Sequence, residues 1–147
     1  MVQEGRTLLL ESIEGEEFYL ASHLLSVSPL NCSGFGKIYL SELSDDELKA
    51  YFSSGEAIKR TVNSITTLED FLPQREQFRK SGFTRDNEEY EYGLSCIALP
   101  IQKDGKTIAG LSLSGPTSRL KHKGIEYLKG QLKKAQEEVH EAMESLG

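Results

Sequence analysis

Several features on which other classes of protein depend are scarce or missing in this chain. It has two cysteines among 147 residues, Cys32 and Cys96, without the paired pattern of a disulfide framework, and this favours a reducing compartment. No segment approaches the roughly 20 consecutive apolar residues of a membrane-spanning helix, and the first residues have no signal-peptide pattern. We therefore expect a cytoplasmic protein with no membrane segment.

Positive charge is also in short supply. The chain has 17 lysines and arginines against 23 acidic residues, which gives a formal net charge of −6. A surface that grips nucleic acid places basic groups on the phosphates, so this balance argues against DNA binding through the chain's own overall charge. The three histidines have no metal-ligand spacing and there is no zinc pattern, so we predict neither a metal nor a cofactor.

Signatures of catalysis are missing as well. The chain contains no phosphate-binding loop and no Ser–His–Asp order. Cys96 would need a basic neighbour or a helix N-terminus to become a reactive thiolate, and its surroundings in the sequence offer neither. We predict that the chain is not an enzyme, and a thiol enzyme that uses Cys96 is the least favoured alternative.

The hydrophobic pattern predicts one α+β domain over residues 1–147, an antiparallel sheet with helices on one side and a concavity on the other. Extended segments are expected at 7–13, 18–25 and 58–65, and helices at 33–43, 44–52, 68–81 and 119–146. Ser44 and Glu47 form a capping box, Thr67 caps the third helix, and Gly82 ends it. The end of the long last helix is expected to overhang the sheet and to contact another subunit.

Residues 96–114 predict a β-hairpin with two unlike faces. Its aliphatic face consists of Ile97, Leu99, Ile101, Ala109, Leu111 and Leu113. The opposite face, which we term the small-residue face, consists of Cys96, Ala98, Ile108, Gly110, Ser112 and Ser114. A sheet face that is neither filled by bulky groups nor charged for solvent has room for a small polar ligand.

The turn of this hairpin allows two registers. A two-residue turn at Asp104-Gly105 would place Cys96 opposite Leu113, and a three-residue loop with a left-handed Gly105 would place Cys96 opposite Ser112. A slip of one residue moves every side chain to the other face. The second register keeps the bulky aliphatic residues together, so the hydrophobic pattern favours it.

Three groups of residues, in this order and spacing, resemble one known family. They are Pro29-Leu30 with Ser33-Gly34-Phe35-Gly36-Lys37; Gly82-Phe83, Asp86, Glu88-Glu89, Gly93 and Cys96-Ile97-Ala98; and Ser112, Ser114, Gly115-Pro116 and Arg119. Together they resemble the C-terminal effector-binding domain of IclR-type bacterial transcriptional regulators. The resemblance implies a GAF/PAS-like fold, a curved antiparallel sheet flanked by helices, whose concave side binds a small effector.

The resemblance also implies a set of effector-binding residues. They are the backbone amides at Gly34 and Phe35, the polar groups of Asp86, Cys96, Ser112 and Ser114, and the apolar wall at Leu94. A glycine-rich helix start independently favours an anion, so a small carboxylate or hydroxyacid is expected. Two residues depart from the family pattern: Asn31 replaces a usual histidine, and Phe35, which replaces a small residue, either narrows the pocket or enters the core.

These observations predict a sensor of a small organic acid or a related metabolite. By the resemblance, it would control DNA binding by a winged helix-turn-helix domain, which has no counterpart in this chain, and would act as a homodimer or homotetramer. The alternative is a dimerisation module whose pocket is vestigial.

Overall fold

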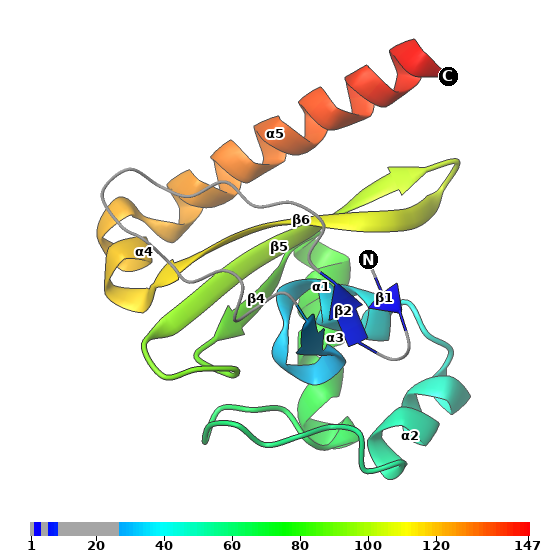
Figure 1. Cartoon of the computed structure of the whole chain (residues 1–147), viewed down its shortest axis with the longest axis vertical. Helices are drawn as coiled ribbons and strands as arrows, with labels where there is room; N and C mark the ends of the chain where they lie inside the picture. Colours follow the sequence, from blue (N-terminus) through cyan, green and yellow to red (C-terminus); the bar gives the residue numbers. More distant parts are fainter. Residues whose placement is uncertain (1, 4–5, 9–26) are drawn as a thin grey trace.

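Helices lie on both faces of an antiparallel sheet in the part of the chain that the structure, a computed structural model, describes: residues 2–3, 6–8 and 27–147 (Figure 1). The strands form two three-stranded sheets, β1 (Val2–Gln3), β2 (Arg6–Leu8) and β3 (Val27–Pro29), then β4 (Thr84–Asn87), β5 (Leu94–Lys103) and β6 (Lys106–Pro116). The helices are the 3-10 turn η2 (Leu30–Cys32), α1 (Gly34–Ser41), α2 (Asp45–Ser53), α3 (Leu68–Ser81), α4 (Thr117–Lys123) and α5 (Ile125–Leu146). This α+β architecture is the predicted fold class. The strand expected at 18–25, and all but the start of the one at 7–13, lie outside the described residues.

The helix ends follow the predicted capping signals. Ser44 Oγ accepts from the N–H of Glu47, and the Glu47 carboxylate accepts from the N–H of Ser44, which completes the capping box of α2. Thr67 Oγ1 accepts from the N–H of Asp70 at the start of α3. Gly82 ends α3 with φ 78°, and its N–H donates to Phe78 O at 2.7 Å. These local predictions are confirmed.

Two predicted elements differ from the structure. Residues 58–65 form an irregular segment rather than a strand, because Ser64 Oγ accepts from the backbone N–H groups of Arg60 and Thr61 and closes a tight turn. The last helix is two helices. Gly124, with φ 94° and ψ 117°, separates α4 from α5, and its N–H donates to the Leu120 carbonyl.

The hairpin register is neither of the two predicted. The turn has two residues, Asp104 and Gly105, with φ 52° and 76°, yet Cys96 lies opposite Ser114. The reason is a β-bulge next to the turn, where Ile101 pairs with Ala109, Gln102 pairs with Thr107, and residue 108 has no partner. The favoured loop and pairing were therefore wrong. The extra residue nevertheless restores the predicted grouping of side chains on the two faces.

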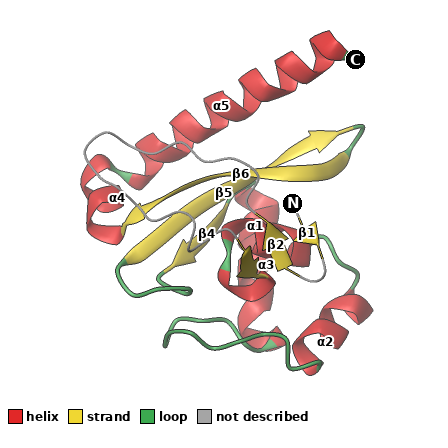
Figure 2. Cartoon of the chain, viewed as in Figure 1, coloured by secondary structure: helices red, strands yellow, loops and turns green. Residues whose placement is uncertain are grey.

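Two apolar cores lie within the described part of the chain. The aliphatic face packs against α4 and α5 through Ile97, Leu99, Leu120, Leu128 and Leu132. A second core joins η2, α1, α2 and α3 through Leu30, Leu40, Leu48, Tyr51 and Phe71. Figure 2 shows α5 on one side of the sheet and α1 and α3 on the other. The expectation of helices on one side only was wrong, because α1 seats itself on the small-residue face.

Within the described residues, no helix has both the length and the apolar character needed to cross a membrane.

Candidate functional site

The start of α1 lies directly on the small-residue face. A Cβ built on Gly34 would stand 2.8 Å from the Cβ of Ala98 and 3.3 Å from Cys96 Sγ, so only glycine allows this approach. Thr84 Oγ1 also donates to the Gly34 carbonyl at 2.6 Å. Sequence analysis placed Gly34 at the site through its amide, and the structure adds that the absence of a side chain sets the spacing between helix and sheet.

The first turn of α1 presents backbone amides at this face. Ser33 caps the helix and its Oγ accepts from the N–H of Gly36 at 2.9 Å. The N–H groups of Gly34 and Phe35 precede that of Lys37, which makes the first intrahelical bond, to Ser33 O, and they therefore have no acceptor within the helix. With the partial positive charge of the helix N-terminus, they favour an anionic group.

The polar residues of the site form a row across three strands. In the β4–β5–β6 register Asp86 lies opposite Cys96, and Cys96 opposite Ser114. Asp86 and Cys96 are buried, whereas Ser114 and its neighbour Ser112 are exposed. The structure therefore brings Gly34 and these four side chains to one face, and half-buried Leu94 is two residues from Cys96 at the start of β5.

Burial controls the ionisation of the two titratable groups in the row. It raises the pKa of the Cys96 thiol to about 11, against the opposing effect of hydrogen bonds with Ser114 and Ser112. The thiol is therefore neutral near pH 7 and is a poor nucleophile. Burial likewise raises the pKa of Asp86 to about 6, although the N–H of Glu89 donates to its carboxylate at 2.8 Å. Asp86 thus titrates close to neutral pH.

A buried ion pair supports the site, and sequence analysis did not assign it a role. Lys37 on α1 is 1% exposed, and its Nζ lies 2.8 Å from Glu89 Oε1. The same ammonium donates to Gln74 Oε1 at 2.7 Å and to the Arg85 carbonyl. Because the N–H of Glu89 donates to the Asp86 carboxylate, the pair ties α1 to the end of β4, where this carboxylate lies. The available signal was that Lys37 is the only charged residue in 33–41.

Asn31 serves the fold rather than the site. Its amide nitrogen donates to the carbonyls of Ile58 and Ile65 at 2.8 and 2.9 Å, and its oxygen accepts from the N–H of Ile58 and the hydroxyl of Tyr51. The side chain is fully buried with all of these bonds made. The departure from the family pattern at this position therefore fixes the 58–65 segment.

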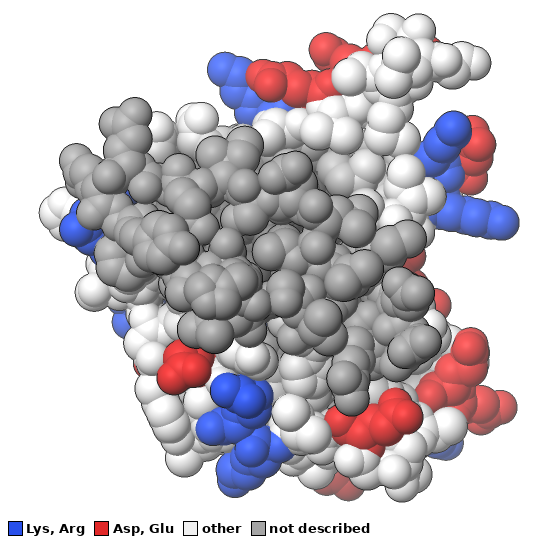
Figure 3. Space-filling model, in the orientation of Figure 1, with Lys and Arg blue, Asp and Glu red and all other residues white. Residues whose placement is uncertain are grey.

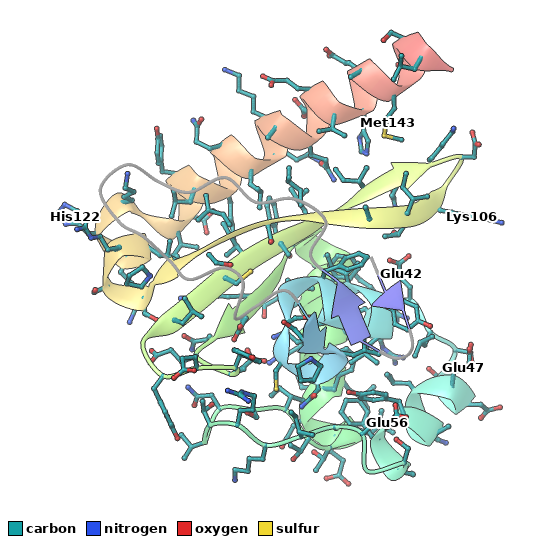
Figure 4. The ribbon with its side chains drawn as sticks, viewed as in Figure 1. Glu42, Glu47, Glu56, Lys106, His122 and Met143 are labelled. Atoms are coloured by element: carbon teal, nitrogen blue, oxygen red, sulfur yellow. The ribbon has the colours of Figure 1, made fainter. Side chains whose placement is uncertain are left out.

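Two hollows flank α1, and of the predicted site residues only Phe35 lines either of them. A polar cavity of about 270 Å³ lies between α1, α3 and β4, with Lys37 and Glu89 in its wall. A groove of about 450 Å³ lies between α1 and the hairpin tip. Its lining residues are Phe35, Tyr39, Glu42, Leu43 and 105–108. We call it the tip groove, and Figure 4 labels Glu42 and Lys106 on its two sides.

The fold is that of a known class of bacterial regulatory domain. Residues 1–141 match the family model described as "Bacterial transcriptional regulator IclR C-terminal". The chain therefore belongs to the IclR family and corresponds to its C-terminal effector-binding domain, with the GAF-like fold that the resemblance implied. The family is one of transcriptional regulators and not of enzymes.

Individual relatives support the assignment. The HTH-type transcriptional regulator KdgR of Dickeya chrysanthemi is 42% identical over 93 residues, which cover 63% of this chain and 30% of KdgR. The crystal structure of the transcriptional regulator YaiJ has a TM-score of 0.81 at 29% identity, over 96% of this chain and 81% of that chain. The inducer-binding domain of PobR from Acinetobacter, a double mutant in complex with 3-hydroxybenzoic acid, has the same fold, with a TM-score of 0.78 at 23% identity over 95% and 83% of the two chains. The chain spans 30–39% of the length of the curated relatives that it matches.

Proposed function

We propose that this domain binds a small organic acid at the small-residue face and thereby controls DNA binding by a winged helix-turn-helix domain of the same regulator. The observation that carries the proposal is the seating of the α1 start on the row of Asp86, Cys96 and Ser114. Helix amides without an intrahelical acceptor and a buried carboxyl group with a pKa of about 6 then meet at one face, which is a suitable environment for a carboxylate that also carries a hydroxyl group.

Each group has a distinct part in this binding. The amides of Gly34 and Phe35 bind the carboxylate of the effector, because they combine free donors with the helix dipole. Ser112 and Ser114 donate to its other oxygens. Asp86 accepts from a hydroxyl group of the effector when ionised and donates to a carbonyl or carboxylate oxygen when protonated. Leu94 limits the site on its apolar side. Hydroxyacids and short carboxylic acids use all of these contacts.

The PobR inducer-binding domain, which shares this fold, was crystallised with a hydroxylated carboxylic acid. A bound acid would control DNA binding by having different affinities for two arrangements of the regulator. Because the chain spans only part of its curated relatives, the DNA-binding domain, a homodimeric or homotetrameric assembly and an intracellular location belong to the proposal.

One observation favours a second candidate, an assembly module without an effector. The ring of Phe35 lies on the small-residue face against Gly110, where it takes up space that a ligand would use. The two candidates differ in their response to added acids.

The test is a thermal-shift screen with pyruvate, glyoxylate, lactate and sugar acids, each at high concentration. A ligand at 100 times its Kd stabilises a protein by about 2.7 kcal/mol. We expect a stabilising acid whose effect is lost in Ser114→Ala and retained in Ser118→Ala, an exposed serine of α4. Stabilisation that survives Ser114→Ala and Asp86→Asn would place the acid elsewhere. No response to any acid would favour the assembly module.

A further inference from the structure

Phe35 and Gly110 form a close contact between α1 and β6. A Cβ built on Gly110 would lie 2.4 Å from one ring carbon of Phe35 and 2.8 Å from another. No side chain larger than hydrogen fits at residue 110 while the ring is in place. The ring is therefore seated on the strand backbone, at the one position of the small-residue face that has no side chain of its own.

The position of this contact relative to the proposed site follows from the strand. Residues 110, 112 and 114 alternate onto one face, and residues two apart on a strand are separated by about 6.8 Å. The ring of Phe35 thus lies over Gly110, whose next neighbour along this face is Ser112, while its backbone amide stays at the helix start. The preceding residue, Gly34, lies close to Ala98, and its carbonyl accepts from Thr84 Oγ1, which fixes the helix start on the sheet.

Open space lies on the other side of the ring. Phe35 lines the tip groove, a hollow of about 450 Å³, together with Tyr39, Leu43 and Ile108. The ring therefore lies between Gly110 of the small-residue face and this groove. A shorter side chain at position 35 would extend the groove over Gly110.

We propose that Phe35 is a specificity-determining residue that limits the size of the acid accepted at the small-residue face. This inference rests on the proposed function above. The ring occupies the volume over Gly110 into which the far end of a longer or aromatic acid would extend. Short-chain acids with two to four carbons fit between the α1 amides and the serines. Benzoic acids do not fit, because their ring and that of Phe35 need the same space.

Removal of the ring has a defined consequence. Phe35→Ala opens the space over Gly110 to the tip groove, where the apolar side chains of Leu43 and Ile108 can contact an aromatic ring. The aromatic ring of a benzoic acid would take the place of the Phe35 ring while its carboxylate meets the same backbone amides. The substitution leaves those amides unchanged.

The test measures binding of pyruvate, lactate and 3-hydroxybenzoate by titration calorimetry to the wild-type chain, Phe35→Ala and Phe35→Leu. Phe35→Leu keeps an apolar side chain without a ring and serves if the alanine variant folds poorly. We expect the wild-type chain to bind a short acid, and the variants to gain at least tenfold in affinity for 3-hydroxybenzoate. Equal affinity of wild type and both variants for 3-hydroxybenzoate would overturn the inference.

The outcomes separate this inference from the function on which it rests. If a short acid binds the wild-type chain and Ser114→Ala abolishes it, but neither variant gains an aromatic ligand, the inference fails and the proposed function stands. If no acid binds any of the proteins, both fail. Gly110→Ala checks the contact without a ligand. We expect it to lower the melting temperature of the wild-type chain and to have a much smaller effect in Phe35→Ala, and equal effects in the two backgrounds would overturn the geometry.

Discussion

Lys37 is a fully buried charge whose hydrogen-bonding capacity is used entirely inside the protein. Its three donors meet Glu89, Gln74 and the Arg85 carbonyl. A buried pair of this kind adds little net stability compared with apolar residues of the same shape, but breaking it leaves one charge without a partner. The pair therefore makes the relative position of α1 and residues 86–89, at the end of β4, specific.

The first prediction concerns this pair. Lys37→Met is expected to lower the free energy of unfolding by about 3–5 kcal/mol, because it strands the Glu89 carboxylate in the interior. Arg79→Ala, which breaks an exposed pair with Glu76, is expected to cost at most about 1 kcal/mol. Urea denaturation measures both. Lys37→Met with Glu89→Leu should be more stable than Lys37→Met alone, and additive losses would contradict a buried pair.

A second prediction at this scale is a pH dependence caused by Asp86. Its pKa is about 6 in the folded chain against a usual 3.8, so the native state keeps a proton that the unfolded chain releases between these values. The free energy of unfolding therefore falls as pH rises through this window, by roughly 2–3 kcal/mol in total. We expect Asp86→Asn to be more stable than wild type at pH 7 and to lose the difference near pH 4.

Urea titrations from pH 4 to pH 8 provide the measurement, and Asp45 provides the control. A hydrogen bond from Arg75 holds the pKa of exposed Asp45 below its usual value. Ionised Asp45 therefore adds to the free energy of unfolding, and this contribution is lost as pH falls, which is the opposite of the pH dependence expected for Asp86. Asp45→Asn should thus be less stable than wild type at pH 7. A constant difference between Asp86→Asn and wild type across the range would contradict the raised pKa.

At the scale of elements, the ends of helices were predictable and the register of the hairpin was not. Capping uses residues within one turn, such as Ser44 with Glu47, so the sequence alone contains the signal. The hairpin pairing depends on a bulge that forms where the strands twist near the tip, and no residue type at 101–109 specifies it. Periodicity nevertheless predicted both faces correctly, because burial selects the pairing that keeps leucines together.

Two glycines in the C-terminal helices give a matched prediction. Gly124 has φ 94° and ψ 117°, a conformation that side-chain-bearing residues avoid, so Gly124→Ala is expected to destabilise by about 1–2 kcal/mol. Gly130 is exposed inside α5, and a methyl group added there would meet no atom within 4 Å, so Gly130→Ala is expected to stabilise by about 0.8–1 kcal/mol. Thermal or urea unfolding compares them, and the same sign for both would contradict the break between α4 and α5.

At the scale of the whole molecule, acidic residues outnumber basic ones, and one group of them lies over α2. Acidic side chains gather over α2 and the turn after it (Figure 3), where Figure 4 labels Glu47 and Glu56. With a formal net charge of −6, this surface repels DNA phosphates. The net charge therefore gives this domain no general attraction for nucleic acid.

The candidate site was predictable to a comparable extent. Alternation along the strands placed Cys96, Ser112 and Ser114 together, and the family resemblance added Gly34 and Asp86. The seating of Phe35 on Gly110 and the pairing of Lys37 with Glu89 join residues 75 and 52 positions apart in the chain, and no local pattern connects them. Both depend on how α1 docks on the sheet, which is a property of the assembled core.

Residue 108, which has no partner in β5, is an extra residue that the hairpin tip accommodates. It leaves the assignment of side chains to the two faces of the hairpin unchanged. Deletion of residue 108 would leave the pairing of Ile101 with Ala109, and of every pair farther from the tip, unchanged. Deletion of one residue between Ala109 and Ser114 would instead move the serines to the face that packs against α5. We therefore expect insertions and deletions among such domains to occur mainly at the tip, and the strands of the small-residue face to keep their length.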